Sequence, residues 1–178
     1  EIADASRIDT EMSRATAEPV DIGALLTMLV EMQRPTVQAE GLHLTLDLAD
    51  GEPIIVSGVD DRLVQVFQNL LSNAQSFSPQ GGEIKIRVAR AGGDIHIDVE
   101  DQGPGVAEDL YEAIFDRFHT FRPKDESFGA HSGLGLSISR QIINAHGGAI
   151  YCRNRQAPDG SVRGACFTIR LPEGDAGA

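Results

Sequence analysis

The sequence predicts an α+β fold, a two-layer α/β sandwich in which a mixed, mostly antiparallel sheet is covered by helices on one face. Segments with alternating apolar residues predict the strands, segments with one apolar face predict the helices, and glycine pairs separate several of them. The predicted order is helix, two strands, helix, a strand hairpin, helix and two strands. This order indicates a sheet whose helices gather on one side.

The N-terminal part of the chain predicts two helical segments. Residues 1–17 are polar, with apolar side chains at roughly helical spacing, and indicate the end of a helix whose partner lies elsewhere. Asp21 is the predicted N-cap of the next helix, because its carboxylate can accept from free N–H groups of the first turn. This helix runs to about Ala39, and Pro35 is expected to kink or weaken it.

Two strands and a third helix follow. Residues 42–48 alternate strictly between apolar and polar side chains, and residues 54–56 form a short apolar run, so each segment predicts a strand. Residues 60–77 carry their apolar side chains on one face, which predicts an amphipathic helix. Asp60 or Asp61 is its predicted N-cap.

The second half of the chain predicts a hairpin and three further elements. Residues 83–88 and 95–99 alternate and are joined through a glycine pair, which is typical of a hairpin. Residues 102–132 are rich in loop-forming residues. The remaining predictions are a helix from about Gly133 to the glycine pair at 147–148, strands over 149–153 and 165–171, and a disordered tail over 174–178.

Charge and cysteine content limit the classes of partner and ligand that are expected. The 27 acidic and 15 basic residues give a net charge of −12, and no basic run exceeds two residues. Nucleic-acid binding needs clustered Lys and Arg, so it is not expected. The apolar stretches are too short to span a bilayer, so a membrane is expected only through a segment upstream of this chain. Cys152 and Cys166 lack metal-ligand spacing and are expected to be small buried thiols.

Two asparagines share one flank of the helix predicted over residues 60–77. Asn69 and Asn73 are four residues apart, so they lie one turn apart beside the apolar stripe. Asparagine is a modest helix former, and its amide oxygen is a competent neutral ligand for Mg²⁺. The pair is a candidate metal or phosphate site, although solvated polar residues would fit the same spacing.

An aspartate and two glycines follow the predicted hairpin. Asp101 ends an alternating strand, where a buried carboxylate needs hydrogen-bond donors. The amine of adenine is such a donor, whereas guanine presents a carbonyl acceptor, so this position would discriminate between the two bases. Gly103 and Gly105 allow the backbone to turn and to approach a ligand closely.

Glycines also lead into the helix predicted from Gly133. The segment from Ser132 to Leu136 reads Ser-Gly-Leu-Gly-Leu, and such a helix N-terminus presents backbone N–H groups and a favourable dipole to an anion. No glycine precedes a lysine, as a P-loop requires, and Ile138 stands where a dinucleotide fingerprint needs its third glycine. The His-Arg-Asp and Asp-Phe-Gly elements of Ser/Thr/Tyr kinases are absent.

Taken in order, four segments resemble a known family. Residues 69–74, 101–105, 115–118 and 133–136 resemble the N, G1, F and G2 boxes of sensor histidine kinases. That family belongs to the Bergerat-fold ATPases, together with gyrase B and MutL. The resemblance covers about residues 20–172.

The resemblance implies ATP and Mg²⁺ as ligands. Asn73 would coordinate Mg²⁺, and Asn69 would assist at the phosphates. Asp101 would accept from the adenine amine, and Phe77 and Ile114 would lie against the ring. The catalytic residues implied are Asn69, Asn73 and Arg122, and the nucleotide-binding residues are Asn69, Asn73, Phe77, Asp101, Gly103, Gly105, Ile114, Arg122, Ser132, Gly133, Leu134, Gly135 and Leu136.

A mobile ATP lid is implied over about residues 118–132. Many members of the family carry Lys where Ser76 stands and Arg where Thr120 stands, and both normally neutralise phosphate charge. Arg122 in the lid is the predicted substitute, with Lys124 nearby.

The resemblance also implies partners. Residues 1–18 would be the end of a dimerisation helix, and residues 19–173 the catalytic ATP-binding domain. This domain would transfer the γ-phosphoryl group of ATP to a histidine of the dimerisation domain, which would pass it to a response regulator. The full-length protein would be a homodimer with this domain in the cytoplasm and an anchor in the bacterial inner membrane.

None of the five histidines of this chain is expected to accept that phosphoryl group. His43 and His96 lie in alternating strands and are predicted to face solvent. His146 precedes a glycine pair that is predicted to end a helix, a place where a cation is favourable.

Three alternatives remain open. A Bergerat-fold hydrolase typically carries a glutamate where Asn69 stands, and a neutral amide cannot take a proton from water. A serine kinase that acts on an anti-sigma partner shares the fold. A nucleotide-sensing or docking module without catalysis would be consistent with Ser76 and Thr120.

Overall fold

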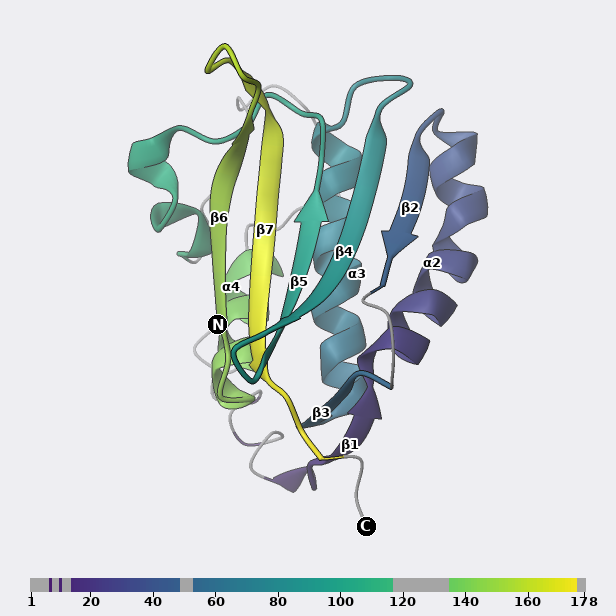
Figure 1. Cartoon of the computed structure of the whole chain (residues 1–178), viewed down its shortest axis with the longest axis vertical. Helices are drawn as coiled ribbons and strands as arrows, with labels where there is room; N and C mark the ends of the chain where they lie inside the picture. Colours follow the sequence, from purple (N-terminus) through teal and green to yellow (C-terminus); the bar gives the residue numbers. More distant parts are fainter. Residues whose placement is uncertain (1–6, 8–9, 11–13, 49–52, 117–134, 176–178) are drawn as a thin grey trace.

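The structure, a computed structural model, describes residues 7, 10, 14–48, 53–116 and 135–175. Within them, one sheet has the strand order β2-β4-β5-β7-β6 (Figure 1). β2 and β4 are parallel, and the other neighbours are antiparallel, so the predicted mixed, mostly antiparallel sheet is confirmed. The strands are β2 (His43–Asp47), β4 (Glu83–Ala91), β5 (Asp94–Glu100), β6 (Ala149–Gln156) and β7 (Val162–Pro172).

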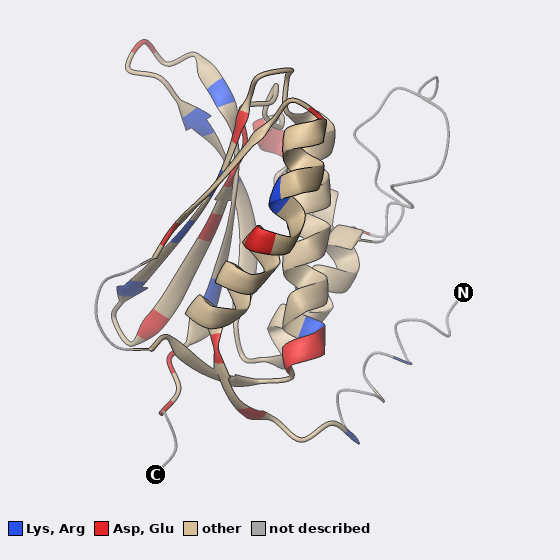
Figure 2. Cartoon of the chain, turned by 90° about the vertical axis from the view of Figure 1, so that its right-hand side faces the viewer, with Lys and Arg blue, Asp and Glu red and all other residues tan. Residues whose placement is uncertain are grey.

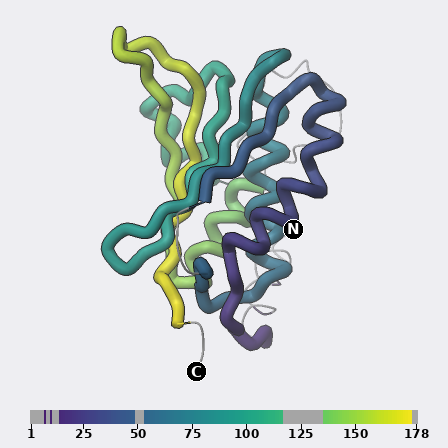
Figure 3. Tube along the Cα trace, turned by 45° about the vertical axis from the view of Figure 1, so that its right-hand side comes forward, coloured from purple at the N-terminus to yellow at the C-terminus, as the bar shows by residue number. Residues whose placement is uncertain are grey.

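The α-helices of the described residues cover one face of this sheet (Figure 2). They are α2 (Ile22–Ala39), α3 (Asp60–Phe77) and α4 (Gly135–Ala145), with 3-10 turns at η1 (Glu108–Leu110) and η2 (Ala113–Phe115). Figure 3 shows the chain passing from α2 directly into β2 at one edge of the sheet. The predicted two-layer sandwich is therefore the observed architecture.

A small second sheet was not expected from the sequence. β1 (Glu18–Asp21) pairs antiparallel with β3 (Ile55–Gly58), so the short strand predicted over 54–56 joins β1 rather than the main sheet. The sequence analysis missed β1 because Pro19 interrupts a segment of only four residues, and proline is tolerated mainly in such edge strands. The amide of Gly174 donates to the carbonyl of Ile55 at 2.8 Å, so the chain remains bonded to β3 beyond β7.

The cap predicted for α2 is confirmed, but the effect predicted for its proline is not. The carboxylate of Asp21 accepts from the amide of Ala24 at 3.1 Å and satisfies one free donor of the first turn. The helix continues through Pro35 to Ala39. Pro35 is exposed, so water can satisfy the carbonyl that loses its helical partner there.

The start of α3 corrects the predicted N-cap. Val59, rather than Asp60 or Asp61, is the N-cap residue, and the two aspartates lie in the first turn, where they suit the helix dipole. The amide of Val59 donates to Nε2 of His146 at 3.0 Å, and Nδ1 of that ring lies 2.7 Å from the carbonyl of Ile142. These two contacts of the His146 ring join the end of α4 to the start of α3.

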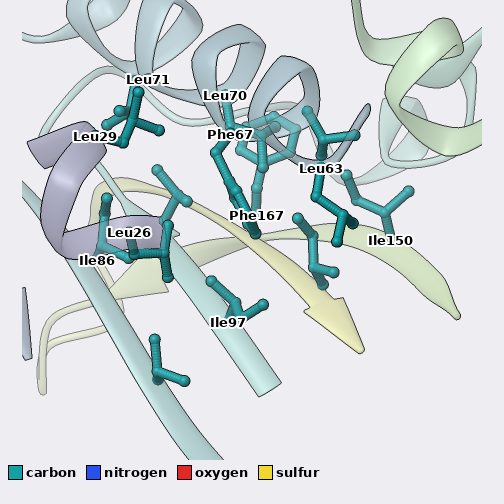
Figure 4. Packing of buried hydrophobic residues seen from close by; sticks show 14 of the residues in the cluster. Leu26, Leu29, Leu63, Phe67, Leu70, Leu71, Ile86, Ile97, Ile150 and Phe167 are labelled. Carbon is teal, nitrogen blue, oxygen red and sulfur yellow. The ribbon is translucent and has the colours of Figure 1, made fainter. Parts of the chain in front are cut away.

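The core lies between the helices and the sheet. Figure 4 shows side chains of α2 and α3 meeting those of the strands, with Phe67 and Leu70 of α3 close to Phe167 of β7. Phe67 and Leu70 are at most 1% exposed. Because α3 turns this face toward the sheet, its asparagine flank is turned toward α4 and the end of β5.

Candidate functional site

A pocket of about 220 Å³ opens where the C-terminal end of α3 meets the loop after β5. This volume is below the ~300–1,000 Å³ of pockets that enclose a whole drug-sized ligand, so it suits one end of a nucleotide. The predicted residues Asn73, Phe77, Asp101 and Gly105 line it together. The other lining residues are Pro104, Val106, Ala107, Leu110, Ala165 and Phe167.

Asp101 is the buried polar group of this pocket. Its side chain is 2% exposed, and Oδ1 accepts from the amides of Gly103 at 2.9 Å and Ala165 at 3.1 Å. Oδ2 has no hydrogen-bond partner among the described residues. The carboxylate is thus held through one oxygen, and its second oxygen is left to accept from a ligand donor.

The pKa of Asp101 is raised above its ordinary 3.8 because burial disfavours the charged form. The amides of Ala165 and Gly103 and the guanidinium of Arg155 act in the opposite direction. Arg155 itself donates from Nη1 to the carbonyl of Asp101 at 2.9 Å. A ligand amine at Oδ2 would further stabilise the ionised carboxylate.

The two glycines of this loop leave no room for a side chain. A Cβ at Gly103 would lie 2.7 Å from the carbonyl oxygen of Phe77. Gly105 has a φ of +78°, and a Cβ there would lie 2.6 Å from Oδ1 of Asn154. Gly103 therefore lets the loop approach the end of α3, and Gly105 lets it approach β6.

Asn69 and Asn73 have different neighbours although they share a flank of α3. Asn73 lines the pocket. The Nδ2 group of Asn69 lies 3.3 Å from the carbonyl of Gly135 and 3.4 Å from Oγ of Ser139, so this side chain joins α3 to the start of α4. The structure thus places Asn69 against α4 and Asn73 at the pocket.

Other predicted residues lie elsewhere or outside the described residues. Ile114 is 1% exposed in the core and is not among the residues that line the pocket, so its contact with a base stays a prediction. Leu136 is half-buried and packs against the core. The predicted site residues that lie outside the described part of the chain are Arg122, Ser132, Gly133 and Leu134.

The sequence analysis missed the part of the pocket that β7 contributes. Ala165 and Phe167 reach it because β7 pairs antiparallel with β5, and the amide of Asp101 donates to the carbonyl of Ala165 at 3.0 Å. No local signal marks these two residues as site residues. Their role follows from strand pairing across 64 residues of sequence.

The cysteines are buried free thiols, as predicted. Burial raises the pKa of Cys152 to about 12 and that of Cys166 to about 11, and the negative charge of Asp98 contributes to the shift at Cys166. Both thiols are therefore protonated at neutral pH. Protonated thiols are poor nucleophiles, and neither cysteine is among the residues that line the pocket.

The fold and the pocket define a class of nucleotide-binding domain. Residues 58–175 match the family described as "Histidine kinase-, DNA gyrase B-, and HSP90-like ATPase", and the chain belongs to that family. ATP is accordingly the nucleotide of this domain. The matched segment begins at the start of α3 and contains every residue that lines the pocket.

Among known proteins, the chain is similar to sensor histidine kinases. It is 44% identical over 180 residues to the sensor protein ChvG of Rhizobium meliloti, a match that covers 98% of this chain and 31% of that protein. The chain therefore spans about a third of the length of such relatives. Among the described residues, no helix has the length and apolarity needed to cross a membrane.

Solved structures agree with this assignment. The mycobacterial sensor histidine kinase MprB is 28% identical, with a TM-score of 0.74 over 88% of this chain and 97% of that chain. Histidine kinase ThkA in complex with the response regulator protein TrrA is 25% identical, with a TM-score of 0.73 over 97% of this chain and 47% of that chain. The Bergerat fold expected from the sequence boxes is thereby confirmed.

Proposed function

We propose that this chain is the catalytic part of a sensor histidine kinase and that it binds ATP with Mg²⁺ for phosphoryl transfer to a histidine. The observation that carries the proposal is Oδ2 of Asp101, which accepts from no described residue and lies in a pocket that Phe77 and Asn73 also line. An ionised carboxylate accepts from the exocyclic amine of adenine, whereas the carbonyl of guanine would meet it as a second acceptor. This end of the pocket therefore selects adenine.

Asn73 is the residue proposed to hold Mg²⁺. Mg²⁺ prefers oxygen ligands, keeps several waters and is commonly bound through one or two protein groups together with phosphate oxygens. One amide oxygen at the rim of the pocket fits that requirement. When bound, the ion would neutralise phosphate charge, which matters in a chain with a net charge of −12.

Transfer to a protein side chain is favoured over hydrolysis by water. At the position where Bergerat-fold hydrolases typically carry a glutamate, this chain has Asn69, whose amide nitrogen already contacts the carbonyl of Gly135. An amide cannot act as a general base, so Asn69 would not activate water. The role proposed for Asn69 is to hold α4 against α3, which keeps the glycine segment near the phosphates.

The proposal includes two partners for the full-length protein. The phosphoryl acceptor would be a histidine of the dimerisation domain, and the next acceptor an aspartate of a response regulator. The complex of ThkA with TrrA supports such a partner, because 97% of this chain is similar to part of ThkA. A cytoplasmic location and an anchor in the inner membrane stay predictions.

Two measurements on this chain test the proposal. Calorimetric titration should show ATP binding that strengthens with Mg²⁺, and much weaker binding of GTP. Phosphate release from Mg-ATP by the chain alone should remain at the uncatalysed rate, because the proposed acceptor histidine lies on another domain. Equal affinities for ATP and GTP would contradict the role of Asp101, and steady phosphate release would favour a hydrolase.

A further inference from the structure

Asn154 of β6 holds the loop that forms the base end of the pocket. Its Oδ1 accepts from the amide of Val106 at 2.8 Å, and its Nδ2 donates to the carbonyl of the same residue at 2.7 Å. Val106 lines the pocket, whereas Asn154 does not. One side chain thus fixes both polar groups of one backbone position in the pocket wall.

Only a carboxamide meets both requirements at this position. The backbone of Val106 presents one donor and one acceptor, and asparagine offers the matching acceptor and donor on one planar group. An aspartate would keep the acceptor but would place an oxygen against the carbonyl. A serine has a single hydroxyl and could not make both bonds in this geometry.

Neighbouring contacts hold Asn154 and the loop in register. The amide of Asn154 donates to the hydroxyl of Tyr111 at 2.9 Å, which joins β6 to the segment after the loop. The next residue, Arg155, donates to the carbonyl of Asp101 at 2.9 Å. Side chains of β6 therefore hold the loop at both ends, at Asp101 and at Val106.

The loop depends on this support because its own backbone is irregular and glycine-rich. Between Asp101 and Val106 the chain has two glycines and one proline, and the residues there form no helix or strand. A Cβ at Gly105 would lie only 2.6 Å from Oδ1 of Asn154, so the carboxamide packs directly against the turn. Without the carboxamide, the loop would lose two bonds and gain conformational freedom.

We propose that Asn154 is a positioning residue for adenine, because it pre-organises the Gly105–Val106 wall against which the base binds. This proposal rests on the proposed nucleotide function and adds to it a residue outside the sequence boxes. Pre-organisation reduces the ordering that binding must impose, so its loss should weaken the affinity for any ligand that contacts this wall.

The test is calorimetric titration of Asn154→Ala with ATP and with adenosine. Both dissociation constants should rise about tenfold, which corresponds to ~1.4 kcal/mol and to the usual net contribution of one or two hydrogen bonds. The dissociation constants of the two ligands should rise by the same factor, because the substitution changes the base end of the pocket and leaves the phosphate end intact. Asn144→Ala, the same change at an exposed position of α4, should leave both constants unchanged.

Asn154→Asp is the second variant and keeps the size of the side chain. It should weaken both ligands at neutral pH, because an oxygen replaces the donor that faces the carbonyl of Val106. The melting temperature of each variant is measured in parallel. Wild-type affinity for both ligands in folded variants, even with a lowered melting temperature, would show that Asn154 is merely structural and would overturn the proposal.

The wild-type titration separates the two levels of inference. If the unsubstituted chain binds no adenine nucleotide, the proposed function fails, and the role of Asn154 fails with it. If the unsubstituted chain binds ATP and the variants bind it equally well, only the role of Asn154 is refuted. A loss for ATP with none for adenosine would also refute it, since the lesion would then lie at the phosphate end.

Discussion

Replacing Asp101 by asparagine should reverse the base preference of the pocket without harming the fold. The amides of Gly103 and Ala165 both point at Oδ1, so the amide oxygen of asparagine must take that place, and its NH₂ group must take the place of Oδ2. A donor then faces the amine of adenine. The same donor would pair with the carbonyl of guanine.

The expected loss of ATP affinity follows from the hydrogen bond that is lost and the donor that is left unpaired. A hydrogen bond to a charged group contributes ~1.5–3 kcal/mol, and an unpaired buried donor costs ~1–3 kcal/mol. Their combination predicts at least a ~100-fold loss of ATP affinity in Asp101→Asn, together with a gain for GTP. Because burial raises the pKa of Asp101, the neutral amide removes an unfavourable buried charge, and the melting temperature should not fall.

The assay is calorimetric titration with Mg-ATP and Mg-GTP, paired with thermal unfolding. Asp98→Asn is the matched control, since it makes the same change on β5 at a residue that does not line the pocket. An Asp101→Asn variant that keeps its ATP affinity within about threefold, with the ratio of ATP to GTP affinity unchanged, would refute the assignment of Asp101 as the base-reading group.

Four further predictions concern pH, which has two, the metal and the core. As pH falls through the raised pKa of Asp101, above 3.8, Oδ2 becomes a donor and ATP affinity should fall in titrations of the wild type but not of Asp101→Asn. The same raised pKa means that the folded state holds this proton more tightly, so the contribution of Asp101 to the free energy of unfolding should decrease as pH rises through that window. Asn73→Ala should abolish most of the Mg²⁺-dependent part of ATP affinity, whereas ATP binding in EDTA should change little; an undiminished Mg²⁺ effect would exclude Asn73 as a ligand. Leu70→Ala, at a side chain that is 0% exposed, should lower the free energy of unfolding by ~2–5 kcal/mol in urea titrations, while Met32→Ala, at 64% exposure, should change it by less than about 0.5 kcal/mol.

Local sequence patterns predicted most of the fold because the responsible forces are local. Strict alternation in residues 42–48 and the apolar stripe of residues 60–77 each determine which face is buried. The glycine pair at 92–93 predicted the hairpin turn, and both glycines have positive φ in the structure. The predictions that failed depended on tertiary contacts, such as the pairing of β1 with β3 and the capping of α3 beside His146.

The same division applies to the site. Asp101 and Gly105 could be found from the sequence because a carboxylate at a strand end and glycines in the following loop have a local signature. Phe167 and Asn154 could not, since they reach the loop only through β7 and β6 and look like ordinary strand residues along the chain. Sequence boxes thus identify residues that line the pocket more readily than residues that hold the pocket in place.

The central claim is that this chain binds ATP and donates its γ-phosphoryl group to a histidine on another domain. Its most direct test is incubation of the chain with γ-labelled Mg-ATP and the dimerisation domain of the same protein, supplied as a separate polypeptide. Label is expected on the dimerisation domain alone, stable in base and lost in acid, and no label is expected with Asp101→Asn. Label on this chain itself, or an acid-stable phosphoprotein, would contradict it.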